Sequence, residues 1–400
     1  MTDTSLTSSF DAFSLREPGS TSLENALARD IAAPAAVRGG HQGQLKLAAR
    51  PLSGSGRDLT RLGATTNAVV VRGFGGPDVL RVEQAPVPRP DRGEVLIETR
   101  AAGIAFGDTL RRQGLAGAAR PPLIPGYDVV GRIAALGPGV SGWTIGERVG
   151  TYVEYGGYAQ AVVASTEALV RVPEGLDDTT AVALVLNYGT AYQMLRHMAD
   201  VERGQRVVVT SAAGGVGTAV LDLARALGVE AVGLASPAKH DLVRQFGGLP
   251  VDYRDPAMLD KVRAALGGKG ADAVFDGIGG GHLWRSRAMT AKRGRVILFG
   301  VASMDGRSSI FGMAPTLFAL LSMKLLGGPA VRPYFSTAEQ AKRRARYAAD
   351  VGALFAMARD RRIRPLIHRT IALDDVAEAH RELAAGGVVG KIVIDLAGAN

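Results

Sequence analysis

A glycine-rich turn carries the strongest chemical signal in this sequence. Residues 207–217 read VVVTSAAGGVG, which predicts a strand over 207–210, a turn at 212–214 and a helix that begins near residue 215. Such a turn offers free backbone N–H groups and the positive end of a helix to a pyrophosphate, while its last glycine lets the helix pack against the strand. The first glycine of the usual G-x-G-x-x-G pattern is Ala212 here, but the strand–turn–helix context still predicts dinucleotide binding. The cofactor-binding residues predicted in this turn are Gly214, Gly215, Val216 and Gly217.

The ends of the next two strands indicate which dinucleotide is bound. A site for NAD usually has Asp or Glu about 20 residues beyond the turn, to bind the ribose 2′-hydroxyl. Residues 235–239 read ASPAK instead, and Tyr253 and Arg254 close the following strand. Ser236, Lys239 and Tyr253 would form a cationic, hydroxyl-bearing pocket suited to the 2′-phosphate of NADP, although Lys239 and Arg254 could equally be solvated surface charges. We therefore expect NADP(H).

Alternating strands and helices surround this turn. Strands are expected at 206–210, 230–235, 251–253, 271–276 and 295–300, with helices at 216–227, 239–246 and 256–266. That alternation is typical of βαβ units on a doubly wound parallel sheet. Before it, short strands punctuated by glycine turns predict a compact β-rich unit from residue 67 to about 187. After it, helices are expected at 337–361 and 374–385 and a last strand at 391–396.

Composition narrows the possible classes of protein. The 400 residues are 46% hydrophobic and contain no cysteine, which excludes disulfide frameworks, thiolate metal sites and thiol nucleophiles. Residues 1–66 are rich in Ser, Thr, Gly and Ala and are expected to be a flexible N-terminal extension without a secretory signal, so cytoplasmic residence is expected. The net charge of +9 attracts anions, but aromatic residues are only 6% and no basic run interleaved with aromatic residues appears, which makes nucleic-acid binding unlikely.

Several short motifs resemble one known family. Residues 101–108 (AAGIAFGD), 125–131 (PGYDVVG), 146–149 (GERV) and 390–391 (GK) fall in the order of the medium-chain dehydrogenase/reductase superfamily. Residues 186–192 and 233–240 are most similar to its zinc-free quinone oxidoreductases and synaptic-vesicle membrane protein homologues. The resemblance implies a GroES-like β-barrel domain, residues 67–189 and 331–400, split around a Rossmann domain, residues 190–330, with the active cleft between them.

The resemblance also places site residues. It implies that Thr190, Phe299, Gly300 and Lys391 line the cofactor cleft, and that the substrate cleft is formed by Phe106, Asp108, Tyr127, Asn187 and Tyr188, each of which could instead be structural. Catalytic zinc in this superfamily needs ligands where Ala105 and Tyr127 stand, so no metal is expected. Related reductases carry Asn where Ala105 stands and often Tyr where Leu110 and Ala116 stand, which favours a more apolar acceptor or weak activity.

These features predict an NADPH-dependent, zinc-independent reductase. Quinones and α,β-unsaturated carbonyls are the expected acceptors, because the charge that develops on them is delocalised and needs no Lewis acid. Two alternatives remain open: an enoyl reductase of a biosynthetic pathway, and a low-turnover NADP-binding protein associated with membrane or nucleic acid. The resemblance implies a homodimer joined through the last strands of the parallel sheet. The apolar segment 311–328 fits that contact or a peripheral membrane contact, and equally a core or lid segment.

Overall fold

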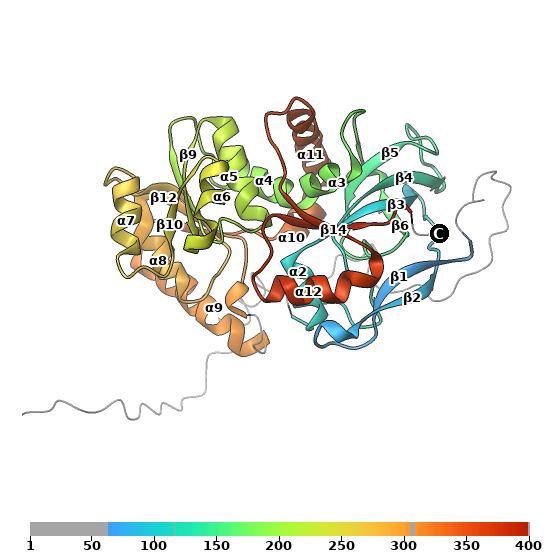
Figure 1. Ribbon diagram of the computed structural model, residues 1–400, viewed down its shortest axis with the longest axis horizontal. Coiled ribbons are helices and arrows are strands. Elements are labelled where there is room, and N and C mark those ends of the chain that lie inside the picture. Colours follow the sequence, from blue (N-terminus) through green and yellow to red (C-terminus); the bar gives the residue numbers. More distant parts are fainter. Residues whose placement is uncertain (1–62, 116, 305–308, 399–400) are drawn as a thin grey trace, which may run out of the picture. The chain divides into compact units, whose positions relative to one another are not determined.

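The computed structural model describes residues 63–115, 117–304 and 309–398 (Figure 1). The expectation of a flexible extension lies almost wholly outside these residues, as does position 116. The folded domain was expected to begin at residue 67, but β1 already begins at Thr65.

A six-stranded parallel sheet holds the glycine-rich turn. The strand order is β10-β9-β8-β11-β12-β13. From β8 the chain adds β9 and β10 on one side and then β11, β12 and β13 on the other, so the strand order reverses between β8 and β11. Ligands of doubly wound sheets bind at such a switch point, beyond the carboxyl ends of the strands. The strands are β8 (Arg206–Val209), β9 (Glu230–Ala235), β10 (Gly248–Asp252), β11 (Ala271–Asp276), β12 (Thr290–Leu298) and β13 (Ala330–Pro333). The expected Rossmann domain is confirmed.

Helices connect and cover these strands, as Figure 1 shows for α5 to α8. In α5 the apolar residues repeat on one face, and Val220 and Leu223 at that spacing are fully buried. The helix ends at Gly228, whose φ of +72° is the left-handed conformation that glycine adopts at helix ends. The helices are α5 (Gly215–Leu227), α6 (His240–Gln245), α7 (Met258–Ala265), α8 (His282–Met289) and α9 (Ser309–Leu326).

A second, mainly antiparallel sheet forms the GroES-like domain. Its strand order is β14-β15-β3-β4-β5-β7, β6 pairs with β3, and β1 and β2 form a separate hairpin sheet. The chain therefore returns to this sheet at its C-terminal end, as expected. The strands are β1 (Thr65–Val71), β2 (Leu80–Pro86), β3 (Glu94–Ile104), β4 (Asp128–Leu136), β5 (Arg148–Tyr152), β6 (Ala161–Ser165), β7 (Val170–Arg171), β14 (Ile367–Ile371) and β15 (Lys391–Asp395).

The domain boundary after the parallel sheet differs slightly from the expectation. Residues 331–333 belong to β13, which pairs with β12, so the return to the antiparallel sheet begins after Pro333 rather than at 331. The helix expected over 337–361 is two helices, α10 (Ser336–Lys342) and α11 (Arg344–Arg359). They are separated at Arg343, whose φ and ψ of −145° and 47° are not helical.

One further helical stretch connects the two domains. It runs through α3 (Asp178–Ala183), η3 (Leu184–Tyr188), α4 (Gly189–Gln193) and η4 (Met194–Met198), and η3 and η4 have π-helical hydrogen bonding. Such widened turns are frequent at functional sites. Here η3 and α4 carry Asn187 and Thr190. The remaining helices that concern the site are α2 (Phe106–Arg112) and α12 (Val376–Ala384).

Candidate active site

A cavity of about 800 Å³ is lined by residues of both domains. One group of lining residues comes from the end of β3 and from α2, and another from the glycine-rich turn and the carboxyl ends of β9, β11 and β12. Residues 383–392 of the C-terminal segment complete the wall. Among the described residues the lining includes Arg111, Lys239 and Arg254 but no Asp or Glu, so the cavity suits an anionic ligand.

The glycine-rich turn lies in the cavity wall as expected, with all four of its predicted residues lining the cavity. Gly214 is the N-cap of α5, and its backbone N–H donates to the carbonyl of Ser211 at 2.9 Å. A Cβ atom at position 217 would lie 2.3 Å from that same carbonyl oxygen and 2.7 Å from Ala212 Cα. Close packing of α5 on the turn therefore requires Gly217, which was the expected reason.

Gly215 is needed for a reason that was not expected. A Cβ atom there would lie 2.3 Å from Asn187 Nδ2 and 3.0 Å from the carbonyl oxygen of Gly390. The absence of a side chain makes room for the η3 helix and for the C-terminal segment. Gly390 in turn bridges to Gly214, and its N–H donates to the carbonyl of Ala213 at 3.1 Å. The antiparallel domain thus closes directly onto the turn.

The residues predicted to form a phosphate pocket lie at the ends of β9 and β10. Ser236, Lys239, Tyr253 and Arg254 all line the cavity. Lys239 Nζ donates to the carbonyl of Gly386 at 2.9 Å, and Arg254 Nε donates to the hydroxyl of Tyr253 at 3.1 Å. Within residues 63–115, 117–304 and 309–398 neither cation is paired with a carboxylate, so both charges remain available to an anionic ligand.

The middle of the cavity is formed where the two domains meet. Asn187 and Thr190 reach it from the interdomain helix, and Phe299 and Gly300 reach it from the end of β12. Phe299 packs so closely on β11 that a Cβ atom at Gly277 would lie 2.9 Å from its ring. The structure thus brings these four predicted residues together.

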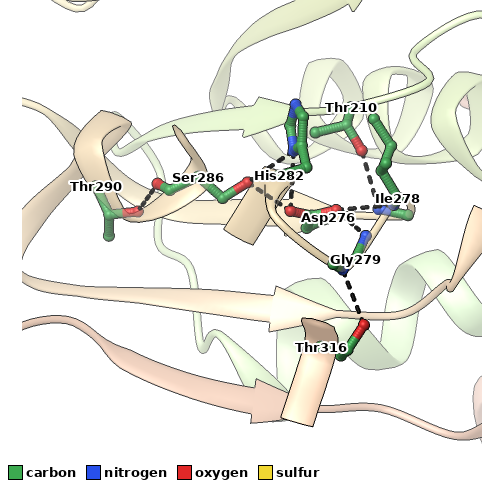
Figure 2. Close-up of polar contacts among 10 residues, drawn as sticks. Thr210, Asp276, Ile278, Gly279, His282, Ser286, Thr290 and Thr316 are labelled. Atoms are coloured by element: carbon green, nitrogen blue, oxygen red, sulfur yellow. Dashed lines mark hydrogen bonds and ion pairs between the residues drawn. The ribbon is translucent and has the colours of Figure 1, made fainter. Parts of the chain in front are cut away.

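A buried carboxylate fixes the loop after β11, as Figure 2 shows. Asp276 Oδ1 accepts hydrogen bonds from the backbone N–H groups of Ile278 and Gly279 at 2.7 and 3.0 Å. Its Oδ2 accepts from Ser286 Oγ at 2.6 Å and lies 3.1 Å from His282 Nδ1. These hydrogen bonds and the nearby His282 lower the pKa of Asp276 despite its burial.

His282 is a cavity residue that sequence reasoning missed. Its ring lines the cavity while Nδ1 faces Asp276, so the opposite ring nitrogen is directed away from that carboxylate. The available signal was its position directly after the GIGGG segment at residues 277–281, at the carboxyl end of a parallel strand.

The remaining part of the cavity is the expected acceptor side, formed by the end of β3, α2 and Tyr127. Ile104, Ala105, Phe106 and Leu110 give it an apolar wall. Tyr127 is nearly buried, and burial raises the pKa of its hydroxyl well above the ordinary value while Arg111 opposes that rise. Tyr127 therefore stays protonated at neutral pH and can donate a hydrogen bond.

Three predicted site residues do not line the cavity. Asp108 is fully buried and accepts hydrogen bonds from the N–H groups of Ala105 and Gly126 at 2.9 and 3.0 Å. It also accepts one from the Tyr158 hydroxyl at 2.9 Å, and burial raises its pKa to about 6. Its role is to hold α2 against the loop before β4. Asp108 was expected to line the substrate cleft, but it does not line the cavity.

Tyr188 and Lys391 are also turned away from the cavity. The hydroxyl of Tyr188 donates to Asp222 Oδ2 of α5 at 2.8 Å, so it joins the interdomain helix to the parallel-sheet domain. Lys391 Nζ lies 2.8 Å from Asp128 Oδ2 in an ion pair without well-directed hydrogen-bond angles, and both side chains are fully buried. A Cβ atom at Gly103, on the strand between them, would lie 2.1 Å from Lys391 Cε.

No cluster of three or more His, Cys, Asp or Glu side chains suited to a metal ion occurs within residues 63–115, 117–304 and 309–398. Within the same residues, no helix is long and apolar enough to cross a membrane.

Comparison with known proteins agrees with this architecture. Residues 91–174 match the model of the alcohol dehydrogenase GroES-like domain, and residues 248–394 match the model described as zinc-binding dehydrogenase. The human synaptic vesicle membrane protein VAT-1 homolog-like is 31% identical over 359 residues, which is 86% of this chain and 85% of the relative. Human quinone oxidoreductase is 33% identical over 344 residues, 82% of this chain and 97% of the relative. A solved mycobacterial protein complexed with NADPH superimposes with a TM-score of 0.73 at 29% identity, covering 82% of this chain and 99% of that one.

Proposed function

The chain belongs to the medium-chain dehydrogenase/reductase superfamily, in its zinc-free branch of quinone oxidoreductases and VAT-1 homologues, and from this premise we propose that it is an NADPH-dependent reductase of quinones and α,β-unsaturated carbonyls. The family binds a nicotinamide cofactor and acts on small molecules. The choice of NADPH and of the acceptor class is our proposal.

The observation that carries the cofactor proposal is the charge of the cavity. No Asp or Glu among the described residues lines it, whereas Lys239 and Arg254 line it beside Ser236, beyond β9 and β10. A carboxylate that would accept the ribose 2′-hydroxyl of NAD is missing there, and two cations suit a 2′-phosphate. The mycobacterial neighbour complexed with NADPH supports the same choice.

The chain's residues can hold such a cofactor in a defined way. The backbone N–H groups at the start of α5 would bind the pyrophosphate, and Thr190 and Phe299 would flank the nicotinamide end. When bound, the cofactor supplies the hydride. The protein orients the acceptor against the apolar wall formed by Ile104, Ala105 and Phe106, and excludes water from it. Tyr127, whose hydroxyl pKa is raised further by burial, would donate a hydrogen bond to the acceptor oxygen.

Cofactor choice is tested by titrating the purified protein with NADPH and NADH. Lys239→Ala should weaken NADPH binding about tenfold or more and leave NADH binding within about twofold, because only NADPH carries the 2′-phosphate. Arg244→Ala is a matched control, since Arg244 is an exposed cation of α6 that pairs with Asp241 and does not line the cavity. Equal losses for both coenzymes would contradict the phosphate pocket.

Acceptor class is tested by following NADPH consumption with 9,10-phenanthrenequinone, a small enone and an enoyl thioester. Turnover with the quinone or the enone supports the proposal, and turnover with the thioester alone indicates the enoyl reductase. Binding of NADPH without any turnover favours the low-turnover protein associated with a membrane. That alternative has one observation of its own, the exposed side chains of Phe318, Leu325 and Leu326 on α9.

We also propose a homodimer joined at β13. This strand is the edge of the parallel sheet, so its outer backbone groups can pair with those of a second copy. Sedimentation velocity should give twice the monomer mass, and a monomer at micromolar concentration would contradict the proposal.

A further inference from the structure

An arginine is buried in the apolar end of the cavity, where no charged group was expected. Arg111 is the sixth residue of α2, its side chain is 4% exposed, and it lines the cavity together with Phe106, Leu110 and Tyr127. A buried guanidinium keeps its charge at every physiological pH. This end of the cavity therefore carries a fixed positive charge in surroundings of low polarity.

Two tyrosine rings hold the guanidinium in place. Its Cζ atom lies 4.2 Å from the ring centroid of Tyr127 and 4.3 Å from that of Tyr155, so the guanidinium packs against two aromatic rings. Tyr127 itself packs against Tyr152, with ring centroids 5.8 Å apart. The cation is thus positioned by packing, and a ligand that reaches it meets a group that is already in place.

The protein compensates this charge only in part. Arg111 donates one hydrogen bond to the backbone carbonyl of Glu154 and another, at 3.3 Å, to the carboxylate of Glu154, which is 52% exposed and solvated. Its Nε atom is buried and has no hydrogen-bond partner among the described residues. The charge of Asp108 also acts on Arg111, but the carboxylate of Asp108 already accepts hydrogen bonds from two backbone N–H groups and from the Tyr158 hydroxyl.

The same end of the cavity is otherwise apolar. The side chains of Ile104, Ala105, Phe106 and Leu110 line it. Arg111 and Tyr127 are the polar side chains that α2 and the segment before β4 contribute there. A ligand at this end therefore meets one cation among mainly apolar side chains.

We propose that Arg111 makes this chain specific for acceptors that carry a carboxylate, which would lie at the α2 end of the cavity with the reducible carbonyl toward Phe299. This inference rests on the proposed function. A neutral acceptor leaves the cation with only the partly exposed carboxylate of Glu154 as its hydrogen-bonded anion, whereas an acceptor carboxylate meets a preorganised opposite charge inside an apolar pocket. The selectivity resides in Arg111, and the Tyr127 ring holds the guanidinium in place.

Binding of a matched pair of ligands tests the proposal without requiring turnover. The probes are 4-oxo-4-phenylbutanoate and its amide, which have nearly the same shape and differ in charge. Each is titrated calorimetrically into the full-length protein saturated with NADP+. We expect the carboxylate to bind at least about tenfold more tightly than the amide in the wild-type protein, because only the carboxylate offers the buried cation an opposite charge. Equal affinities for the two probes would overturn the proposal.

Variants assign the preference to the residue. Arg111→Met should bring the two affinities within about twofold, Arg111→Lys should keep part of the preference, and Tyr127→Phe, which keeps the aromatic ring, should keep most of it. Arg171→Met is the matched control, because Arg171 also stacks on an aromatic ring, Trp143, and pairs with a glutamate, but on the surface. A preference that survives in Arg111→Met, or is lost in Arg171→Met, would overturn the proposal. If Arg111→Met does not fold, loss of the preference in Arg111→Gln replaces it as the deciding result.

Failure of the proposed function gives a different pattern. In that case NADPH is not consumed with any quinone or enone, whereas the carboxylate preference and its dependence on Arg111 are still measured by binding. Turnover of neutral enones with kcat/KM equal to that of carboxylated ones, in an otherwise active enzyme, would contradict the specificity alone.

Discussion

Replacing Lys391 with methionine measures how much the buried ion pair between β15 and β4 contributes to stability. The two side chains are 1% and 0% exposed, and Lys391 Nζ lies 2.8 Å from Asp128 Oδ2. Removing one partner of a buried pair costs about 3–5 kcal/mol, because the other charge is left without compensation. Asp128 can escape this penalty by binding a proton, which costs about 4 kcal/mol at pH 7 for a carboxyl with an ordinary pKa of about 3.9. We therefore expect the free energy of unfolding to fall by about 3–4 kcal/mol at pH 7.

The pH dependence of that loss separates lost charge from lost packing. Burial raises the pKa of Asp128 and Lys391 opposes the rise, so removing Lys391 raises this pKa further. The folded variant then holds a proton that the unfolded chain has released. The difference in the free energy of unfolding between the wild type and the variant should therefore shrink by about 1.4 kcal/mol for each pH unit below 7. Urea unfolding of the wild type, Lys391→Met and the double variant Asp128→Asn, Lys391→Met between pH 5 and 7 measures this. A loss of unfolding free energy that is the same at every pH would refute the reasoning. So would a double variant that is no more stable than Lys391→Met.

Two other substitutions test the close packing at Gly217 and the burial of His380. Gly217→Ala should lower the free energy of unfolding by about 1–3 kcal/mol and weaken coenzyme binding, because the new Cβ atom would meet backbone atoms of Ser211 and Ala212 at 2.3 and 2.7 Å. Gly281→Ala, whose Cβ atom meets nothing within 4 Å, is the control for thermal melting and should change little. His380 is fully buried beside the Tyr158 hydroxyl, and burial lowers its pKa to about 3. Between about pH 6.5 and 3 the unfolded chain therefore binds the proton that the folded one excludes, so stability falls as the pH falls through this range. His380→Gln should remove about 2 kcal/mol of the loss between pH 7 and pH 5, and a loss as steep as in the wild type would show that His380 does not titrate in this way.

Elements whose structure depends on local patterns could be predicted from the sequence. The β-branched run before the glycine-rich turn, and the apolar spacing of Val220 and Leu223 after it, predict a strand, a turn and a helix, and all three are present. Gly217 could be assigned its packing role because the need for a glycine arises within the turn itself. The expected phosphate pocket also lines the cavity, because the ends of adjacent parallel strands meet at one edge of the sheet.

The direction of single side chains could not be predicted, because it depends on strands distant in sequence. Lys391 begins a strand, and only the placement of β15 beside β3 and β4 brings it to Asp128. The position of Arg111 in the cavity wall could not be predicted. Residues 108–112 of α2 are all buried, so no amphipathic pattern distinguishes the side of the helix that faces the cavity. Tyr188 lies in a π-helical turn, which shifts the face on which each following residue lies relative to an ordinary helix.

The bridge between Gly214 and Gly390 has a consequence for biosynthesis. The glycine-rich turn is translated well before the segment that pairs with it, because the two glycines lie 176 positions apart in the sequence. A nascent chain can therefore assemble much of the parallel sheet before residue 390 has been added, whereas this wall of the cavity stays incomplete until then. A fragment that stops near residue 389 would lack the segment that packs onto the turn.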